Sequence, residues 1–352
     1  MLETLAEQLA RAESLAEDQI RQAVELLSSE MVSAASKADF LAALARKGET
    51  PAEIAAFAGA LRERSIPVPL DEETRAREIL DIVGTGGDRL GTFNISTTAA
   101  IICAAAGVTV AKHGNRAVTS QAGSADVLEA LGIRIDLSPA EAARCLREKH
   151  FAFFFAPGFH PAFKHIGPAR KLCAERGQRT IFNFLGPLLN PVRPSAVLVG
   201  VASSELCEPL AHVLQSLGVR RGMVVSGTVK NESGGGRPAG LDELSTLGDN
   251  TVAEFYHERG FTASGLSLDN FPLQPARLAD LLGGDKFHNA EITRRILHGK
   301  ERGPKRDAAL LNASAALFVA GRTKSLIEGW ELAGETIDAG KAGAKLADLV
   351  KN

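Results

Sequence analysis

The sequence has few cysteines, no marked excess of positive or negative charge and no long apolar run. Its four cysteines, at positions 103, 145, 173 and 207, include no Cys-x-x-Cys pair, which argues against a disulfide framework or a zinc site. Free thiols in a reducing cytoplasm are the simpler expectation. The net charge of −2 is spread along the chain, which disfavours general electrostatic binding to nucleic acid or a membrane surface.

No uninterrupted apolar stretch approaches the length that crosses a membrane. Residues 1–21 carry acidic side chains among apolar ones and lack the basic and apolar regions of a secretory signal. We therefore expect a cytoplasmic protein with no membrane partner. The length of 352 residues predicts about two domains and allows a sizeable core.

The N-terminal residues 2–66 have apolar side chains at helical spacing, for example Ile20, Val24 and Leu27. Thr50-Pro51-Ala52-Glu53 supplies a cap residue, a proline at the first helical position and an acid in the first turn, which predicts a helix start. Residues 67–77, rich in proline and charge, read as a connector. We predict a small helical domain over residues 1–78, to which helices from about 161–190 are a candidate addition.

From residue 80 onward, strand and helix patterns alternate. The predicted strands cover residues 80–84, 108–112, 151–156, 195–201 and 222–226, and the predicted helices cover 97–106, 121–131, 138–148, 161–175 and 203–217. This alternation predicts an α/β domain over residues 79–352, with a mainly parallel central sheet flanked by helices. The alanine- and leucine-rich block 304–350 is expected to form helices that pack over the sheet.

Two polar turns follow the first two predicted strands. The first is Gly84-Thr85-Gly86-Gly87-Asp88, and the second is Lys112-His113-Gly114-Asn115-Arg116. Glycines allow close backbone approach and positive φ, and a helix N-terminus offers unpaired N–H donors, so the first turn suits an anion. Lys112 and Arg116 add positive charge in the second turn. Asp88 would repel a bare phosphate, but it could accept sugar hydroxyls or help to bind a cation.

Neither turn matches a dinucleotide or Walker signature, and either one alone is weak evidence. Their separation of about 30 residues matches one βαβ unit, so both turns should meet at the same edge of the sheet. Further along, the adjacent acids Asp242 and Glu243 are usually no more than a solvated loop. A magnesium ion on a polyphosphate, however, takes one or two carboxylates together with phosphate and water oxygens.

The segment 156–191 is too irregular for one helix, and prolines at 187, 191 and 194 predict a stiff, extended connector that could act as a hinge or a wall between domains. His160 and His165 lack the helical spacing of a zinc pair and are expected to be structural. Arg170 has no role that the local pattern reveals, because most arginines on amphipathic helices face water.

Taken together, these motifs resemble the anthranilate phosphoribosyltransferases of tryptophan biosynthesis, in order and spacing over nearly the whole chain. The residues that carry the resemblance are the two turns, Asn94-Ile95-Ser96-Thr97, Phe182-Asn183-Phe184-Leu185-Gly186-Pro187-Leu188-Leu189-Asn190-Pro191, Asp242-Glu243-Leu244-Ser245 and Asn312-Ala313-Ser314-Ala315-Ala316-Leu317. The resemblance implies a fold like that of nucleoside phosphorylases and phosphoribosyltransferases. It also implies transfer of phosphoribosyl from phosphoribosyl pyrophosphate to the amine of anthranilate, and a homodimer that forms through the helical domain.

The resemblance assigns site residues by position. The implied donor-binding residues are Gly84, Gly87, Asp88, Thr92, Asn94, Ile95, Ser96, Thr97, Lys112, His113, Gly114, Asn115, Arg116, Ala117, Val118, Thr119, Ser120 and Ser124. The implied anthranilate-binding residues are Gly84, Asn115 and Arg170, and the implied Mg²⁺ ligands are Ser96, Asp242 and Glu243. No general base is assigned, because an arylamine is already unprotonated at neutral pH. His113 is the nearest candidate, although it fits a structural or packing role equally well.

The sequence departs from the family pattern at one point, and it leaves three alternative functions open. The stretch 170–179 is a few residues longer than is usual in the family, so another aromatic acceptor is an alternative to anthranilate. A nucleoside phosphorylase of the same broad architecture would also act at the anomeric carbon, although its phosphate-binding segments differ from the second turn. A nucleic-acid-binding relative of the fold would be expected to have a basic groove and a degraded metal site.

Overall fold

The N-terminal residues form helices whose apolar stripes face one another, as their spacing predicts. The structure is a computed structural model that describes residues 1–117, 121–230, 238–257 and 259–351. The first helices are α1 (Leu2–Ala10), α2 (Glu17–Ser28), α3 (Ala34–Lys47) and α4 (Pro51–Glu63). At the start of α4, Glu53 N–H donates to the Thr50 hydroxyl at 3.2 Å and Thr50 N–H donates to the Glu53 carboxylate at 2.9 Å, which is the expected capping box.

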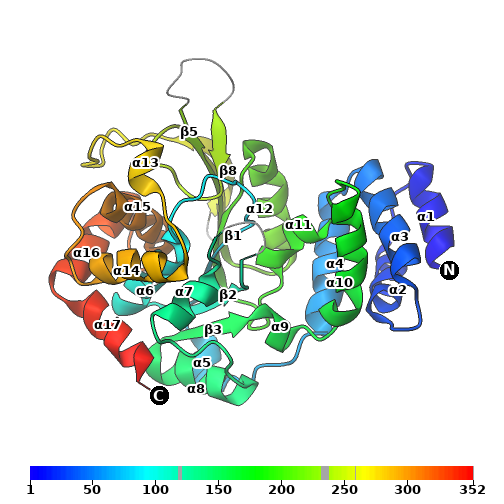
Figure 1. Ribbon diagram of the computed structural model, residues 1–352, viewed down its shortest axis with the longest axis horizontal. Helices are drawn as coiled ribbons and strands as arrows, with labels where there is room; N and C mark the ends of the chain where they lie inside the picture. The colour runs from blue at the N-terminus through cyan, green and yellow to red at the C-terminus, as the bar shows by residue number, and fades with distance from the viewer. Residues whose placement is uncertain (118–120, 231–237, 258, 352) are drawn as a thin grey trace.

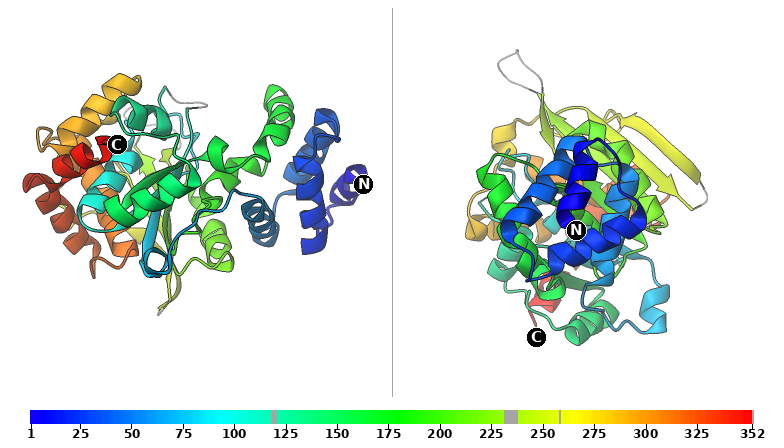
Figure 2. Two further views of the ribbon diagram at one scale, coloured as in Figure 1. Left: turned by 90° about the horizontal axis from the view of Figure 1, so that it is seen from below. Right: turned by 90° about the vertical axis from the view of Figure 1, so that its right-hand side faces the viewer.

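A helix from the middle of the chain packs against this bundle. The proline-rich segment folds as α9 (Ala156–Phe159), α10 (Phe163–Glu175), α11 (Phe182–Leu185) and the 3₁₀ turn η1 (Gly186–Leu188). In Figures 1 and 2, α10 stands beside the N-terminal helices at the end of the molecule remote from the C-terminus. The prediction of an extended connector was therefore wrong for residues 182–188. Pro187 lies in the first turn of η1, where its fixed φ suits a helical conformation.

The described residues form an eight-stranded sheet in the order β3-β2-β1-β4-β5-β7-β8, with β6 paired to β5. The strands are β1 (Ile79–Gly84), β2 (Thr109–Gly114), β3 (Phe151–Phe155), β4 (Ala196–Gly200), β5 (Arg221–Val229), β6 (Ala239–Leu241), β7 (Asn250–Tyr256) and β8 (Arg259–Leu266). Strands β1 to β5 pair in parallel, whereas β6, β7 and β8 join antiparallel. The mainly parallel sheet was predicted, and the antiparallel extension was not.

Alternate residues of the strands enter separate apolar cores on the two faces of the sheet. On one face, Ile82, Val110 and Leu198 pack with the C-terminal helices, which confirms that the block 304–350 covers the sheet. The helices of this face include α6 (Ile95–Ala105), α7 (Ser124–Ala130), α14 (Lys286–Leu297), α15 (Pro304–Val319), α16 (Leu326–Asp338) and α17 (Lys341–Val350). None of the helices in the described part of the chain is long and apolar enough to cross a membrane.

On the other face, Val197 and Val199 of β4 pack in one continuous cluster with the N-terminal bundle and α10. A smaller cluster beneath β3 includes Leu146 and Phe154. The remaining helices are α5 (Glu72–Ala76), α8 (Pro139–Lys149), α12 (Cys207–Ser216), α13 (Leu278–Leu281) and the 3₁₀ turn η2 (Ser204–Leu206). Figure 1 shows the bundle on one side of the sheet and the C-terminal helices on the other.

Candidate active site

Three neighbouring strands of the sheet, β2, β1 and β4, each end in a glycine at the same edge. A Cβ added at Gly84 would lie 3.2 Å from the carbonyl oxygen of Asp242, and one added at Gly200 would overlap that oxygen and lie 3.1 Å from Glu243 N. Glycine at these strand ends therefore lets the backbone of Asp242 and Glu243 rest directly on the edge of the sheet.

The two acids bond to the first glycine turn. Gly86 N–H donates to Asp242 Oδ2 at 2.6 Å, and Ser96 N–H, in the first turn of α6, donates to Glu243 Oε1 at 3.1 Å. Gly86 and Gly87 have φ of +74° and +87°, the positive values that the glycine-rich sequence predicts. Residues more than 140 positions apart in the chain are thus brought together at the N-terminus of a helix.

Burial changes the proton affinity of this acid pair. It raises the pKa of Asp242 well above its usual range, and the neighbouring Asp88 and Glu243 carboxylates raise it further. Burial also raises the pKa of Glu243 to about 7, against the opposing influence of Lys112 and the Ser96 N–H. Excess negative charge and oxygen donors fit a hard divalent cation. Within the described residues, no group of three or more His, Cys, Asp or Glu could bind a metal alone, so such an ion needs phosphate or water oxygens as well.

Lys112 places a positive charge beside the acid pair. Its ammonium group is buried at the end of β2, donates to the Ile82 carbonyl at 2.6 Å and lies 3.5 Å from Ser96 Oγ. Burial lowers the pKa of Lys112, whereas the Asp81 and Glu243 carboxylates raise it. The side chain therefore points toward the site that the sequence assigned to phosphate.

Asp81 lies behind Lys112 in the middle of β1. Its carboxylate accepts hydrogen bonds from His113 N–H at 3.2 Å and from Asn190 Nδ2 at 2.8 Å, and Asn190 Nδ2 also donates to the Ala111 carbonyl at 2.7 Å. Burial raises the pKa of Asp81 to about 6, so the group is ionised at neutral pH and provides a countercharge for Lys112. Asn190 also attaches the connector after α11 to β1 and β2.

A column of rings runs from the second turn to Arg170. The His113 and His160 rings are 5.3 Å apart, His160 lies 5.7 Å from Phe163, and Phe163 lies 5.5 Å from Phe182, all edge-to-face. The Arg170 guanidinium lies 5.3 Å from the centre of the Phe182 ring. Arg170 is solvent-exposed, yet the surrounding protein lowers its pKa by desolvation. A flat ligand with one anionic group could contact both the rings and this cation.

The two histidines of the column are neutral at physiological pH. Burial lowers the pKa of His113 to about 3 and that of His160 to about 4, although hydrogen bonds to the backbone of Gly186 and Leu189 act in the other direction. Their Nε2 atoms are buried and have no hydrogen-bond partner within the described residues. Neutral rings with a free acceptor atom suit packing against a polar aromatic ligand better than general base catalysis.

The chain matches the glycosyl transferase family in two parts, its helical bundle domain over residues 3–65 and its a/b domain over residues 76–343. The anthranilate phosphoribosyltransferase of Petrotoga mobilis is 44% identical over 98% of this chain and 95% of that protein. The enzyme of Roseiflexus castenholzii is 46% identical over 97% of this chain and 96% of its own length. The chain belongs to the anthranilate phosphoribosyltransferase family.

Solved structures of the same name have the same fold. Anthranilate phosphoribosyltransferase from Thermus thermophilus matches with a TM-score of 0.86 and 42% identity, over 98% of each chain. The Saccharomyces cerevisiae enzyme in complex with phosphoribosyl pyrophosphate and Mg matches with a TM-score of 0.84 and 28% identity, over 99% of this chain and 97% of that one. The yeast enzyme with 4-fluoroanthranilate matches at 0.82 and 26%, over 99% and 98%. These findings support the anthranilate phosphoribosyltransferase interpretation over the nucleic-acid-binding alternative.

Eight of the eighteen residues that the sequence assigned to the donor, from Gly84 to Thr97, belong to the first turn and the start of α6. Asn94 connects this turn to its surroundings, because its Nδ2 donates to the Ala122 carbonyl at 3.2 Å and its Oδ1 accepts from Asn289 at 2.9 Å. Ile95 and Thr97 are buried in α6, and Thr92 forms an isolated bridge with Leu282. These residues stabilise the first turn from behind rather than form the surface that would face the donor.

The placement of Arg116 differs from the expectation for a phosphate ligand. Its guanidinium pairs with Asp126 at 2.9 Å and with Glu129 at 3.1 Å, both on α7, and it also lies 5.7 Å from the centre of the Phe155 ring. Two carboxylates therefore already take up its donor groups. The predicted residues Val118, Thr119 and Ser120 lie outside the described residues.

The rest of the second turn packs closely on α7. Ser124 begins this helix, and its hydroxyl donates to the Asn115 carbonyl at 3.4 Å, while Ala117 N–H donates to Asp126 at 3.0 Å. A Cβ added at Gly114 would overlap Ser124 Oγ, so glycine is needed for this contact. The second turn and the start of α7 therefore form one unit.

Sequence reasoning missed Asp81, Asn190 and Phe163 and left His160 as a structural residue. The sequence does indicate a role for Asp81, because a lone acid inside the apolar strand Leu80–Val83 must have a partner when it is buried. The sequence does not indicate which residue is that partner, since Asn190 is more than 100 residues away in the chain.

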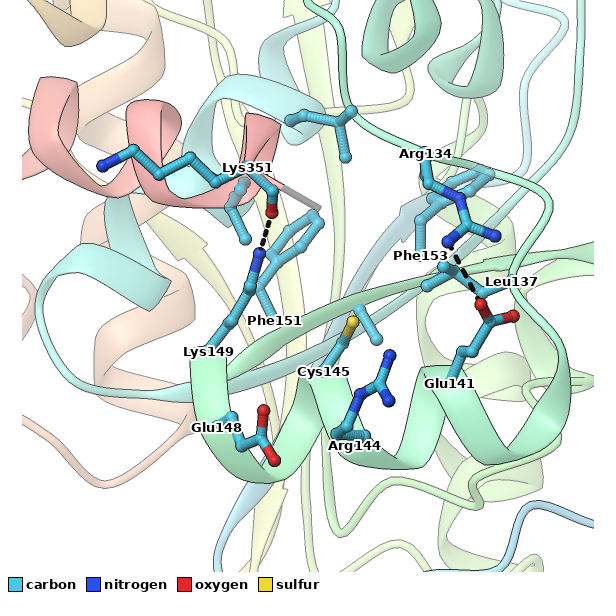
Figure 3. A pocket seen from close by; sticks show the side chains of 13 residues that line it. Arg134, Leu137, Glu141, Arg144, Cys145, Glu148, Lys149, Phe151, Phe153 and Lys351 are labelled. Atoms are coloured by element: carbon cyan, nitrogen blue, oxygen red, sulfur yellow. Dashed lines mark hydrogen bonds and ion pairs between the residues drawn. The ribbon is translucent and has the colours of Figure 1, made fainter.

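Two cavities lie beside the outer strand β3, and neither is lined by the acid pair. The first, of about 360 Å³, also borders α8, and the second, of about 390 Å³, borders the segment 132–136 between α7 and α8. Figure 3 shows the first, where Arg134 reaches Glu141 and Lys149 reaches the backbone of Lys351. Of the site residues that the sequence predicted, Arg116 lines the second cavity. The size of these cavities is therefore no guide to the active site of this anthranilate phosphoribosyltransferase family member.

We predict that Gly200→Ala reduces activity by about tenfold or more, because the new Cβ displaces Asp242 and an ångström-scale shift of a catalytic group is costly. The measurement is kcat/KM for phosphoribosyl pyrophosphate. Gly59→Ala in α4 is the control, because nothing lies within 4 Å of its added Cβ. It should keep full activity and gain about 0.5–1 kcal/mol of stability. Unchanged kinetics in the Gly200 variant would mean that the edge of the sheet accommodates the added methyl group without displacing Asp242 from its functional position.

We also predict a pH effect on stability from Asp81. Its pKa of about 6 in the folded protein exceeds the ordinary value of 3.8, so its contribution to stability is full below about pH 4 and is lost as the pH rises through about 6. The unfolding free energy of the wild type minus that of Asp81→Asn should therefore fall as the pH rises, by on the order of 3 kcal/mol at most. Urea unfolding between about pH 4 and pH 7 measures it.

A control for this experiment is Asp71→Asn. Hydrogen bonds from Thr74 lower the pKa of the Asp71 cap, so its contribution to stability is lost as the pH falls rather than as it rises. Between about pH 4 and pH 7 the difference for Asp71→Asn should therefore stay nearly constant, whereas the difference for Asp81→Asn falls as the pH rises. Parallel curves for the wild type and Asp81→Asn would show that the Asp81 carboxyl does not titrate in this range.

Proposed function

We propose that the chain transfers the 5-phosphoribosyl group of phosphoribosyl pyrophosphate to the amino group of anthranilate and releases pyrophosphate. The observation that carries this proposal is the bonding of Asp242 and Glu243 to the first glycine turn beside Lys112. The yeast relative that binds phosphoribosyl pyrophosphate and Mg supports the donor and the metal, and the yeast complex with 4-fluoroanthranilate supports the acceptor.

The donor would lie across the carboxyl ends of β1 and β2. Backbone N–H groups of the first turn and the N-terminus of α6 suit its phosphates, and the Lys112 ammonium adds a positive charge nearby. Asp88, whose carboxylate lies near Asp242, would accept ribose hydroxyls or contact the cation through water. As the bond from the anomeric carbon to pyrophosphate breaks, these fixed donors stabilise the growing negative charge.

Magnesium is the cofactor that this chemistry favours. Asp242, Glu243 and the Ser96 hydroxyl would contact it, because they offer oxygen ligands in a buried position. Burial, and to a lesser extent neighbouring carboxylates, already raises the pKa of both acids there. When bound, the ion supplies charge neutralisation for the pyrophosphate leaving group. The residues present fit this ion, because its remaining ligands can come from phosphate and water.

The acceptor would bind against the ring column. Arg170 would pair with the anthranilate carboxylate, and the His160, Phe163 and Phe182 rings would pack against the aromatic ring. Asn115 and Gly84, at the ends of β2 and β1, would orient the amine toward the anomeric carbon. Positioning then carries much of the rate, and no general base is required.

We propose further that residues 1–78 form a small helical domain and residues 79–352 an α/β domain, with α10 and α11 contributing to the helical side. The shared apolar cluster of α10 with the bundle supports this division. The helical side would also form a homodimer, for which the exposed Met1 and Met31 offer apolar surface. The free cysteines suit a reducing cytoplasm.

The first test mixes the purified protein with anthranilate, phosphoribosyl pyrophosphate and Mg²⁺ and follows the loss of anthranilate fluorescence. We expect loss that requires all three components. Asp242→Asn should lower the apparent affinity for Mg²⁺ by about 10–100-fold, the cost typical of disturbing a metal site. A sample without donor is the control. Absence of any pyrophosphate release, whichever arylamine is offered, would overturn the proposed reaction.

A separate test addresses the acceptor. Arg170→Met should raise KM for anthranilate by about 10–100-fold, because the loss of a hydrogen bond to a charged group costs about 1.5–3 kcal/mol. KM for phosphoribosyl pyrophosphate should change little. Arg176→Met, on the turn after α10, is the matched control, because that side chain pairs with Asp39 rather than with the ring column. An unchanged KM for anthranilate in the Arg170 variant would remove Arg170 from the acceptor site.

A further inference from the structure

Lys37, in helix α3, is a buried cation that the reaction does not use. Its side chain is 2% exposed, and its ammonium group donates to the carbonyl of Ser29 at 2.6 Å and to the carbonyl of His165 at 2.9 Å. No carboxylate in the described part of the chain forms an ion pair with it. Burying an ammonium group without a counter-ion is costly, so the two carbonyl contacts must be structurally important.

The His165 carbonyl belongs to α10, and this helix has a weak point. Pro168 lies inside α10 and has no N–H, so it cannot donate to the Lys164 carbonyl one turn earlier. The half of α10 before Pro168 is therefore less firmly joined to the half after it than in an uninterrupted helix. A contact that holds the first half in place has more effect here than elsewhere.

Three consecutive residues of α3 contact α10 on both sides of this proline. Lys37 holds the half before Pro168 through His165. After the proline, Cys173 Sγ donates to the Ala38 carbonyl at 3.5 Å, and Arg176, just beyond the helix, pairs with Asp39 at 3.0 Å. The Asp39 pair is exposed and therefore contributes little. Lys37 is thus the main polar attachment of the first half.

Both halves of α10 deliver a side chain to the same ring. Phe163, before Pro168, lies 5.5 Å from the Phe182 ring, and Arg170, after it, lies 5.3 Å from the same ring. The angle between the halves therefore sets the distance between the aromatic surface and the guanidinium group. An acceptor that contacts both would be sensitive to this angle.

We propose that Lys37 is a positioning residue for the acceptor, because it fixes the first half of α10 and thereby sets the spacing between Phe163 and Arg170. This inference rests on the proposed role of Arg170 in binding the acceptor carboxylate. Lys37 itself touches neither substrate, and it acts through the backbone of His165.

The test is Lys37→Met, which keeps the length of the side chain and removes the donors. KM for anthranilate should rise roughly tenfold, since misplacement by about 1 Å can cost about a hundredfold in rate or binding. KM for phosphoribosyl pyrophosphate should stay within about twofold, because the first turn is not attached to α3. Lys37→Gln, which keeps one amide donor group, should give a smaller rise and provides the measurement if the Met variant does not fold.

Lys47→Met is the matched control. Lys47 ends the same helix, its side chain is 4% exposed, and it pairs with Glu53 at 2.7 Å without contacting α10. It should lower the melting temperature and leave KM for anthranilate unchanged. If the Lys37 and Lys47 variants lower the melting temperature and change both KM values alike, Lys37 is only a stability residue and the proposal is overturned.

A double variant separates this proposal from the one on which it rests. In the Arg170→Met background, Lys37→Met should raise KM for anthranilate by a smaller factor than in the wild type, because one of the two acceptor contacts whose spacing it sets is already gone. Additive effects would overturn the positioning role of Lys37. If Arg170→Met alone leaves KM unchanged, the acceptor assignment fails first. If Arg170→Met raises KM and both Lys37 variants do not, the failure belongs to Lys37 alone.

Discussion

The active-site edge of the sheet depends on one buried ammonium group. Lys112 lies between Asp81 behind it and Glu243 in front, and both carboxylates favour its charged form although burial opposes it. Removing either partner would leave a charge without compensation in a region of low dielectric constant. The positions of β1, β2 and the Asp242–Glu243 segment are therefore coupled through charge as well as through backbone packing.

The acid pair has a second consequence for the substrate-free protein. Asp242 and Glu243 already accept hydrogen bonds from Gly86 and Ser96, the N–H groups that would otherwise be open to phosphate. A free anion must therefore compete with two bonded carboxylates, and an anion that arrives with a cation does not face the same repulsion. The arrangement favours a metal-complexed pyrophosphate over inorganic phosphate.

Local patterns in the sequence predicted the helical bundle, the parallel strands and the two turns, because helix caps, apolar periodicity and strand-to-helix glycines are properties of short segments. The pairing of Asp81 with Asn190, the anchoring of α10 by Lys37 and the ion pairs of Arg116 were not predicted. Each joins side chains whose choice of partner depends on the three-dimensional path of the chain. The antiparallel strands β6 to β8 were not predicted, because β6 has only three residues and β8 contains two glycines, so neither has a clear apolar alternation.

The position of β1 inside the sheet, between β2 and β4, has a consequence for synthesis on the ribosome. Its partners are β2, which follows directly, and β4, which pairs Ala196 with Leu80. At about 5–20 residues per second, the ribosome needs roughly 6–22 seconds to proceed from Gly84 to Ala196. During this interval the strand that carries Asp81 has one open edge and lacks the Asn190 bond. A nascent chain of this length is therefore the form most in need of protection against aggregation.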